Sequence, residues 1–325
     1  MTSRSETPAA ILRAGVSPFP PAQAYACAHA PGAAMPDDKA SILIQLDVDP
    51  QPSVFDAVVA VDARVDHLFR HGDVTPENVQ DLVYGALFTR GPSDLHRTAL
   101  FVGGSDVAKA EAVLEAIKKT FFGAFRVSVL FDANGSNTTA AAAVLAARSS
   151  LGGSLEGARA VVLAATGPVG QRVARLLGRQ GATVAVGSRD ANRSGKLAER
   201  LAATTGARYD AFSNADPDDL SRTLESAALI VAAGPEGARL LSAPQWQGLG
   251  RLRVVVDLNA VPPSGVEGVE PTDKNVDKGG VRAWGALGVG GLKMKIHKRA
   301  VQELFGSNDK VLDAEEVLEL GRDLA

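Results

Sequence analysis

A short turn between a predicted strand and a predicted helix is the feature of this sequence with the clearest chemical use. The apolar run 160–163 leads into Ala165-Thr166-Gly167-Pro168-Val169-Gly170, and helix-spaced apolar residues follow. In dinucleotide-binding proteins such a turn lets the backbone approach a pyrophosphate, which lies against free amides at the helix N-terminus. Ala165 replaces the first glycine of that pattern, so a purely structural turn stays an alternative. We predict cofactor contacts at Thr166, Gly167, Pro168 and Val169.

The predicted second strand, 181–187, ends at the position where dinucleotide-binding domains distinguish NAD from NADP. Ser188 and Arg189 lie about 20 residues beyond the glycine turn, where an acidic residue would bind the ribose 2′-hydroxyl of NAD. A hydroxyl and a guanidinium suit the 2′-phosphate of NADP instead. We therefore predict NADP as the cofactor, bound by Ser188 and Arg189. Asp190 is adjacent and keeps NAD open as a second cofactor, and a solvated loop charge is the alternative for Arg189.

Two later strands of the same region end beside small or polar residues. Gly234 follows the predicted strand 229–233, and Asn259 follows the predicted strand 253–258. Ligands of open parallel sheets bind outside the carboxyl ends of the strands. We predict that Gly234 and Asn259 face the cofactor, with ordinary turn residues as an equal alternative.

Strands and helices alternate along most of the chain. Before the glycine turn, strands are expected at 41–48, 67–70, 98–102 and 126–131. Helices separate them, including one capped at Thr75-Pro76 and, after the last strand, an alanine-rich helix ending near residue 147. This alternation predicts parallel sheets with right-handed crossovers. The expected fold class is two α/β domains, the second with a Rossmann-like parallel sheet, with a deep cleft between them.

The domain boundaries follow from the same alternation. Residues 1–40 are rich in alanine and proline and are expected to form a flexible tail, with Met35 as a candidate translation start. Residues 41–150 form the first, substrate-binding domain, and 151–290 form the nucleotide-binding domain. The helices within 291–325 are expected to join the first domain.

Composition narrows the class of protein. With 325 residues, a formal charge of -3 and 46% hydrophobic residues, the chain gives no electrostatic indication of a nucleic-acid partner. Cys27 is the only cysteine, which excludes an internal disulfide and fits a reducing, cytoplasmic compartment. No apolar run is long enough for a membrane span, and the histidines lack metal-ligand spacing. We expect a soluble enzyme with no metal site.

The last glycine-rich segment, 284–291, is predicted to be a turn before a helix at 292–305. Lys293 then lies in the first helical turn, where the helix dipole disfavours a cation. An unfavourable position suggests a functional role for Lys293, and a solvated surface lysine is the alternative. His297 lies one turn further and would share its helix face.

Four segments of this chain together resemble a known enzyme family. They are Pro52-Ser53-Val54-Phe55-Asp56, Asp132–Thr139, Ala165–Gly170 and Trp284–Lys295. In this order they are similar to the NAD(P)-dependent methylene-tetrahydromethanopterin dehydrogenases of methylotrophic bacteria, most of all to the NADP-specific branch. The likeness extends over residues 41–325. It implies hydride transfer from the methylene carbon of a reduced pterin to NADP, which leaves the methenyl form; some members of that branch also accept methylene-tetrahydrofolate.

The resemblance also implies roles for individual residues. Lys293 matches the active-site lysine of the family, which orients the pterin or tunes its ring nitrogens. The loop after the fourth strand would contact the pterin or the cofactor through Asn134, Ser136, Asn137 and Thr138. Because a nitrogen lone pair drives the hydride out, positioning and charge do most of the catalysis. Carboxylates that could stabilise the amidinium product, or simply cap helices and turns, are Asp47, Asp56 and Asp132.

Three other functions are weighed against this one. A folate-type dehydrogenase and cyclohydrolase carries a Tyr-x-x-x-Lys pair, and no tyrosine of the first domain has a lysine at that spacing. A non-catalytic NADP sensor would tolerate loss of the 132–139 loop or of Lys293, and neither is lost. A shikimate-type NADP reductase would share Ser188 and Arg189 but not the final glycine-rich segment. The sequence does not separate a methanopterin from a folate carrier, and a homo-oligomer is expected.

Overall fold

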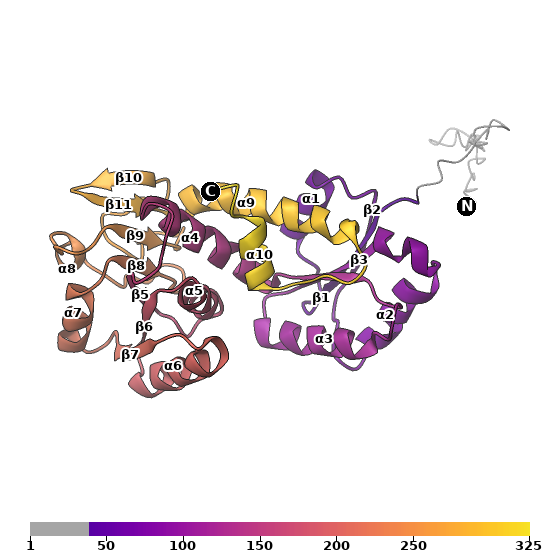
Figure 1. Cartoon of the computed structure of the whole chain (residues 1–325), viewed down its shortest axis with the longest axis horizontal. Helices are drawn as coiled ribbons and strands as arrows, with labels where there is room; N and C mark the ends of the chain where they lie inside the picture. The colour runs from indigo at the N-terminus through magenta and orange to yellow at the C-terminus, as the bar shows by residue number, and fades with distance from the viewer. Residues whose placement is uncertain (1–38) are drawn as a thin grey trace, which may run out of the picture. The chain divides into compact units, whose positions relative to one another are not determined.

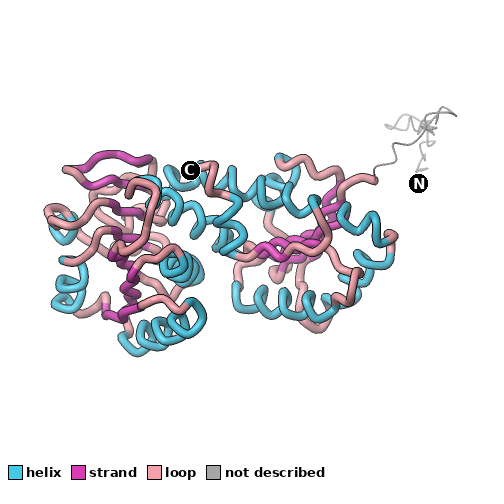
Figure 2. The backbone as a smooth tube through the Cα atoms, viewed as in Figure 1, coloured by secondary structure: helices cyan, strands magenta, loops and turns pink. Residues whose placement is uncertain are grey.

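The computed structural model describes residues 39–325. The predicted tail lies outside this range except for its last two positions, and so do Met35 and Cys27. The described chain contains two sheets, each with helices on both faces (Figures 1 and 2). Within this range no helix is long and apolar enough to cross a membrane.

The first sheet is parallel throughout and has the strand order β12-β4-β3-β1-β2. Its strands are β1 (Ile42–Asp47), β2 (His67–His71), β3 (Thr98–Gly103), β4 (Ser128–Phe131) and β12 (Val311–Leu312). Ile42 pairs with both His67 and Thr98, which places β1 between β2 and β3. In chain order this is the 2-1-3-4-5 arrangement, whose topological switch point lies between β1 and β3.

The two faces of this sheet are covered by different helices. The helices concerned are α1 (Val54–Asp62), α2 (Val79–Phe88), α3 (Val107–Thr120) and α9 (Ala286–Glu303). Leu100 of β3 belongs to a core shared with α2 and α3, whereas its neighbour Phe101 belongs to the opposite face, shared with α1 and α9. Successive side chains of a strand point to opposite faces, so the buried run of β3 serves both cores.

The second sheet has the strand order β10-β11-β9-β8-β5-β6-β7. Its strands are β5 (Arg159–Leu163), β6 (Thr183–Ser188), β7 (Tyr209–Ser213), β8 (Leu229–Ala232), β9 (Val254–Asp257), β10 (Lys274–Lys278) and β11 (Val281–Trp284). All neighbours are parallel except β10, which pairs antiparallel with β11 at the edge. The parallel strands have the Rossmann order, with the switch point between β5 and β8. The predicted pair of parallel α/β sheets is confirmed.

One hydrophobic core joins the two sheets. Its residues come from both sheets and from several helices: α4 (Ser136–Ser150), α5 (Pro168–Arg179), α6 (Ala191–Thr205), α9 and α10 (Ala314–Leu320). The segment 140–147 of α4 is completely buried and consists mainly of alanine. Alanine is the strongest helix former, and its small side chain lets α5, α9 and α10 pack close to α4. The opposite face of the second sheet is covered by α7 (Pro217–Glu225) and α8 (Ala243–Trp246).

Helix α9 overturns the prediction for the last glycine-rich segment. The helix begins at Ala286, so Lys293 is its eighth residue and not part of its first turn. Lys293 therefore does not meet the positive end of the helix dipole, and that prediction is wrong. Gly288 lies inside this helix and lets it pack against the backbone at Asp273. A Cβ on Gly288 would lie 1.9 Å from the Asp273 carbonyl oxygen.

Smaller differences occur at other elements. Helix α2 begins at Val79 rather than at Pro76, because the Thr75 amide donates to Asn78 Oδ1 at 2.8 Å and closes a turn ahead of the helix. The antiparallel hairpin of β10 and β11, the short helix α8 and the strand β12 were not expected from the sequence.

Candidate active site

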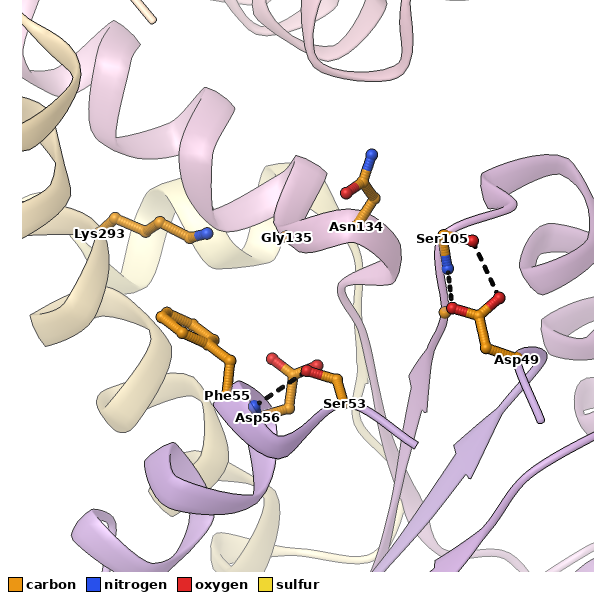
Figure 3. Close-up of a pocket in the computed structure, with 9 residues that line it drawn as sticks. Asp49, Ser53, Phe55, Asp56, Ser105, Asn134, Gly135 and Lys293 are labelled. Carbon is orange, nitrogen blue, oxygen red and sulfur yellow. Dashed lines mark hydrogen bonds between the residues drawn. The ribbon is translucent and has the colours of Figure 1, made fainter. Parts of the chain in front are cut away.

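A pocket of about 290 Å³ lies at the carboxyl ends of β1, β3 and β4 (Figure 3). It spans the switch point of the first sheet, where ligands of doubly wound folds bind. The segments after these three strands form most of its wall, and α9 adds one residue. The lining residues are Asp49, Ser53, Phe55, Asp56, Gly104, Ser105, Asn134, Gly135 and Lys293.

Asp47 fixes the segment between β1 and α1. Its carboxylate is fully buried and accepts hydrogen bonds from the amides of Asp49 (3.0 Å) and Ser53 (3.1 Å). Ser53 in turn caps α1 by accepting from the Asp56 amide at 3.3 Å. Asp47 therefore shapes the pocket from behind without lining it, and the geometry favours the turn-capping alternative for this residue.

Asp49 and Ser105 connect the loops after β1 and β3, across the pocket from Lys293 (Figure 3). The Ser105 amide donates to Asp49 Oδ2 at 2.8 Å, and the Ser105 hydroxyl donates to Oδ1 at 2.9 Å. Sequence reasoning missed both residues. The signal was present, because each follows a predicted strand at the end where ligands of parallel sheets bind.

Asp132 organises the loop after β4. Its buried carboxylate accepts from the amides of Asn137 (2.9 Å) and Thr138 (3.0 Å) and from the Thr138 hydroxyl (2.6 Å). Ser136, Asn137 and Thr138 are 0% exposed and do not line the pocket. Asn134 has a left-handed backbone (φ 53°) and an exposed side chain in the pocket wall. Of the four polar residues predicted to contact substrate from this loop, the structure brings Asn134 alone to the pocket.

Lys293 extends from α9 toward the start of α4 (Figure 3). Its Nζ lies 5.2 Å from the centroid of the Phe55 ring, over the ring face. A Cβ on Gly135 would lie 2.4 Å from Nζ, so the glycine leaves the space that the amine occupies. The predicted catalytic lysine thus lies in the same pocket as Asp56 and Asn134.

Asp56 titrates near neutral pH. Burial is the main cause that raises the pKa of its carboxyl to about 7, and the negative charge of Asp132 adds to the rise. The hydrogen bond with Ser53 and the nearby Lys293 ammonium oppose part of this increase in pKa. A carboxyl with such a pKa is partly ionised at neutral pH, so its charge responds to a cation bound beside it.

His297 packs behind the pocket, one helical turn after Lys293. Its ring stacks on Phe101 with the ring centroids 5.7 Å apart, and Nδ1 lies 3.9 Å from Asp132 Oδ2. Burial lowers the pKa of this imidazole below its ordinary value, so it is neutral at neutral pH. At 1% exposure it packs against the residues that line the pocket without reaching a ligand.

The glycine turn lies at the other switch point, between β5 and β8. Pro168 is the first residue of α5 and no side chain caps this helix, so its first amides can bind an anion. A Cβ on Gly170 would lie 2.8 Å from Ala165 Cα, so this glycine is needed for the helix to pack on the turn. A Cβ on Gly167 would meet the Ala164 carbonyl oxygen at 3.7 Å, an ordinary contact. Crowding therefore does not require a glycine at 167, and the uncapped N-terminus of α5 beside it offers free amides to a pyrophosphate.

The end of β6 offers groups for the ribose. Ser188 is the last residue of this strand and accepts from the Asp190 amide at 3.2 Å, and Arg189 is exposed beside it. The Asp190 carboxylate caps α6 by accepting from the Asn192 amide at 2.8 Å. A carboxylate engaged in this cap is less free to bind a ribose hydroxyl, which favours a 2′-phosphate at Arg189.

Gly234 and Asn259 differ in their surroundings. Gly234 follows β8, at the carboxyl end that borders the switch point, as a cofactor contact requires. Asn259 is 4% exposed; its side-chain amide donates to the Pro263 carbonyl at 3.1 Å and its Oδ1 accepts from the Val261 amide at 3.0 Å. The geometry favours the turn alternative for Asn259.

Within residues 39–325, no group of three or more histidine, cysteine, aspartate and glutamate residues is arranged to hold a metal ion. The pocket offers one lysine, Lys293, two carboxyl groups, Asp49 and Asp56, and the side-chain amide of Asn134.

Comparisons with known proteins agree with this arrangement. A family model for the N-terminal part of methylene-tetrahydromethanopterin dehydrogenase matches residues 54–134. The chain is 44% identical over 284 residues to the "Bifunctional protein MdtA" of Methylorubrum extorquens, covering 87% of this chain and 99% of the relative. It is 30% identical over 299 residues to an NAD(P)-dependent methylenetetrahydromethanopterin dehydrogenase of the same organism, covering 88% and 99%.

Among solved structures, the shikimate 5-dehydrogenase of Listeria monocytogenes, in complex with shikimate and NAD, has a TM-score of 0.50 and 13% identity. The match covers 90% of this chain and 99% of that chain, and it shows a common fold alone. Sequence identity of 44% and 30% over nearly the whole length of both relatives shows common descent. This chain belongs to the methylene-tetrahydromethanopterin dehydrogenase family.

Proposed function

We propose that this protein oxidises methylene-tetrahydromethanopterin to the methenyl form, with NADP as the hydride acceptor. The observation that carries the proposal is the convergence of Lys293, Asp56 and Asn134 in one pocket at the switch point of the first sheet. A turn that fits a dinucleotide lies at the switch point of the second sheet, and the two sheets share one core. A family relative is named for this activity and for NAD(P) dependence.

The pocket suits a reaction that creates positive charge. NADP, when bound, accepts the hydride from the carbon between two pterin nitrogens, and no proton is released. The amidinium product is a cation, which the Asp56 carboxylate stabilises from the pocket wall. Lys293 and Asn134 donate hydrogen bonds that hold the pterin ring in the orientation that hydride transfer requires.

Methylene-tetrahydrofolate is proposed as a second substrate. The two carriers share the reacting ring and differ mainly in their tails, and the pocket residues assigned above all act on the ring. The direct test is a spectrophotometric assay of the purified chain with both methylene carriers and with NAD and NADP. We expect reduced nicotinamide to form at the highest rate with NADP and methylene-tetrahydromethanopterin. No turnover with either carrier would disprove the proposed function.

Arg189→Ala is expected to raise KM for NADP about 10-fold or more, while KM for NAD changes little, because the guanidinium contacts only the 2′-phosphate. The measurement is initial rates over a range of each cofactor. Arg193→Ala is the matched control, since Arg193 carries the same charge but lies on α6, whereas Arg189 lies between β6 and this helix. Equal effects of Arg189→Ala on both cofactors would remove Arg189 from the 2′-phosphate site.

The rate of hydride transfer is expected to rise about 10-fold between about pH 6 and about pH 8, as the Asp56 carboxyl loses its proton. The reaction itself releases no proton, so this dependence reports on the protein. Asp56→Asn should lower the rate at high pH and flatten the profile. A profile unchanged in Asp56→Asn would assign the ionisation to another group.

The same ionisation affects stability with a defined sign. The pKa of Asp56 is raised from 3.8 to about 7 in the folded protein, so between these values the folded state holds more protons than the unfolded chain. Stability therefore falls as pH rises through this window. Asp56→Asn is expected to raise the melting temperature more above pH 7 than near pH 4, which thermal scans at the two pH values can check.

We also propose that the protein is a homo-oligomer located in the cytoplasm. The outer face of α1 carries Val54, Val58 and Val61, which are 70%, 55% and 65% exposed. Apolar residues at this helical spacing are more typical of a subunit contact than of a solvated face. Light scattering of the purified chain measures its mass in solution.

A further inference from the structure

Arg172 is a buried arginine that connects the glycine turn to the loop after β4. It lies on α5, one turn after Pro168, and is 7% exposed. Its Nη1 donates to the Pro168 carbonyl at 3.2 Å, and its Nε donates to Asn137 Oδ1. Its Nη2 donates to Glu111 Oε1 at 2.9 Å. One guanidinium thus contacts α5 itself, α3 and the start of α4.

Asn137 links Arg172 to the loop that forms the pocket wall, because it is hydrogen-bonded to both. Its side-chain amide donates to the Phe131 carbonyl at 2.6 Å and to Asp313 Oδ1 at 2.8 Å, so both ends of the side chain are engaged. Its backbone amide donates to Asp132 Oδ1 at 2.9 Å. Since Asp132 holds the loop that carries Asn134, the position of Arg172 and the position of this loop are coupled.

The guanidinium has further contacts that fix its plane. Its central carbon lies 5.5 Å from the centroid of the Phe131 ring, and Phe131 is the last residue of β4. A planar group with several donors can hold three acceptors at set angles, which a lysine ammonium does not reproduce. The structure therefore favours arginine at this position for its geometry as well as its charge.

We infer that Arg172 is a positioning residue for hydride transfer, which sets the distance between the nicotinamide carried by the glycine turn and the one-carbon unit held in the pocket. The inference rests on the proposed function. Reacting atoms have to lie about 3–3.5 Å apart, and a shift of about 1 Å costs about 100-fold in rate. Arg172 is buried and does not line the pocket, so we expect its loss to change the rate of transfer more than the affinity for either ligand.

The test is steady-state kinetics of Arg172→Lys, which keeps the positive charge beside Glu111 and loses the planar group. We expect kcat to fall 10- to 100-fold while KM for NADP and for the pterin stays within about threefold. With substrate deuterated at the methylene carbon, the isotope effect on kcat should rise, because hydride transfer becomes more strongly rate-limiting. Arg179→Lys is the control, since Arg179 pairs with Glu315 near the end of the same helix, and it should leave kcat unchanged.

A merely structural arginine gives a different result. In that case Arg172→Lys lowers the melting temperature but leaves kcat and the isotope effect unchanged well below the melting temperature, and this outcome overturns the inference while the proposed function stands. Asn137→Ala provides the second arm: coupling predicts that Arg172→Lys adds little to its effect on kcat. Fully multiplicative effects of the two substitutions overturn the coupling. Absence of turnover in the unmodified protein overturns the proposed function and this inference together.

Discussion

Lys293→Ala is expected to lower kcat with methylene-tetrahydromethanopterin about 100-fold, because the donor that orients the pterin for hydride transfer is lost. The Nζ of Lys293 lies over the Phe55 ring and beside Gly135. Removal of the amine therefore leaves a space between these two residues. NADP affinity, measured by titration in the absence of pterin, should not change.

Lys295→Ala is the matched control for that substitution. Lys295 lies two residues further along α9 with its side chain exposed, and it does not line the pocket. It should leave kcat unchanged. An unaltered turnover number in Lys293→Ala would exclude Lys293 from the reaction, whereas loss of activity in both variants would indicate a general effect on α9.

Gly135→Ala is expected to reduce activity about 100-fold by displacing the Lys293 amine, since a misplacement of about 1 Å has an effect of this size. A Cβ at this position would lie 2.4 Å from Nζ, and the backbone has a φ of +57°. The left-handed conformation adds a stability loss of about 1–2 kcal/mol for alanine, which thermal or denaturant unfolding can measure.

Gly123→Ala separates the two effects of Gly135→Ala. Gly123 has a φ of +53°, and a Cβ there would meet no atom within 4 Å. It should show the same loss of stability with full activity. If Gly135→Ala also kept full activity, the amine of Lys293 would not need its present position.

The alternation of strands and helices was predictable because it depends on local patterns of apolar residues. The order of strands within each sheet was not, since pairing joins distant segments such as β12 and β4. The hairpin of β10 and β11 had a local signal in Gly279 and Gly280, a pair that favours a two-residue turn. Strand β10 is almost entirely exposed and lacks an apolar pattern, and β11 has only four residues, which is why the hairpin was missed.

The sequence singled out the glycine turn, Lys293, Asp56 and Asn134, and the last three lie in one pocket, but the reason given for Lys293 was wrong. A glycine-rich segment looked like a turn, whereas the glycines at 285 and 288 let a helix pack against the backbone of residues 270–273. The alanine at 165 is also explained, because the left-handed residue of that turn is Ala164 (φ 53°).

Other features of the site depend on contacts that no local pattern contains. The hydrogen bonds of Arg172 to Asn137 and Glu111 span 35 and 61 residues, and those between Ser105 and Asp49 span 56. Ser136, Asn137 and Thr138 have the polar character of ligand contacts, yet their side chains are buried and hydrogen-bonded to other groups of the protein. Polarity alone does not distinguish a side chain that holds a loop from one that meets a substrate.

The position of β12 and α9 late in the chain has a consequence for the protein during its synthesis. Four strands of the first sheet leave the ribosome early, but the edge strand and the lysine of its pocket are encoded after the entire Rossmann sheet. The part of this sheet's face that α9 covers therefore stays open to water in the nascent chain until α9 has been translated. A nascent chain that lacks α9 also lacks Lys293, so we expect one wall of the pocket to be missing until that helix has folded.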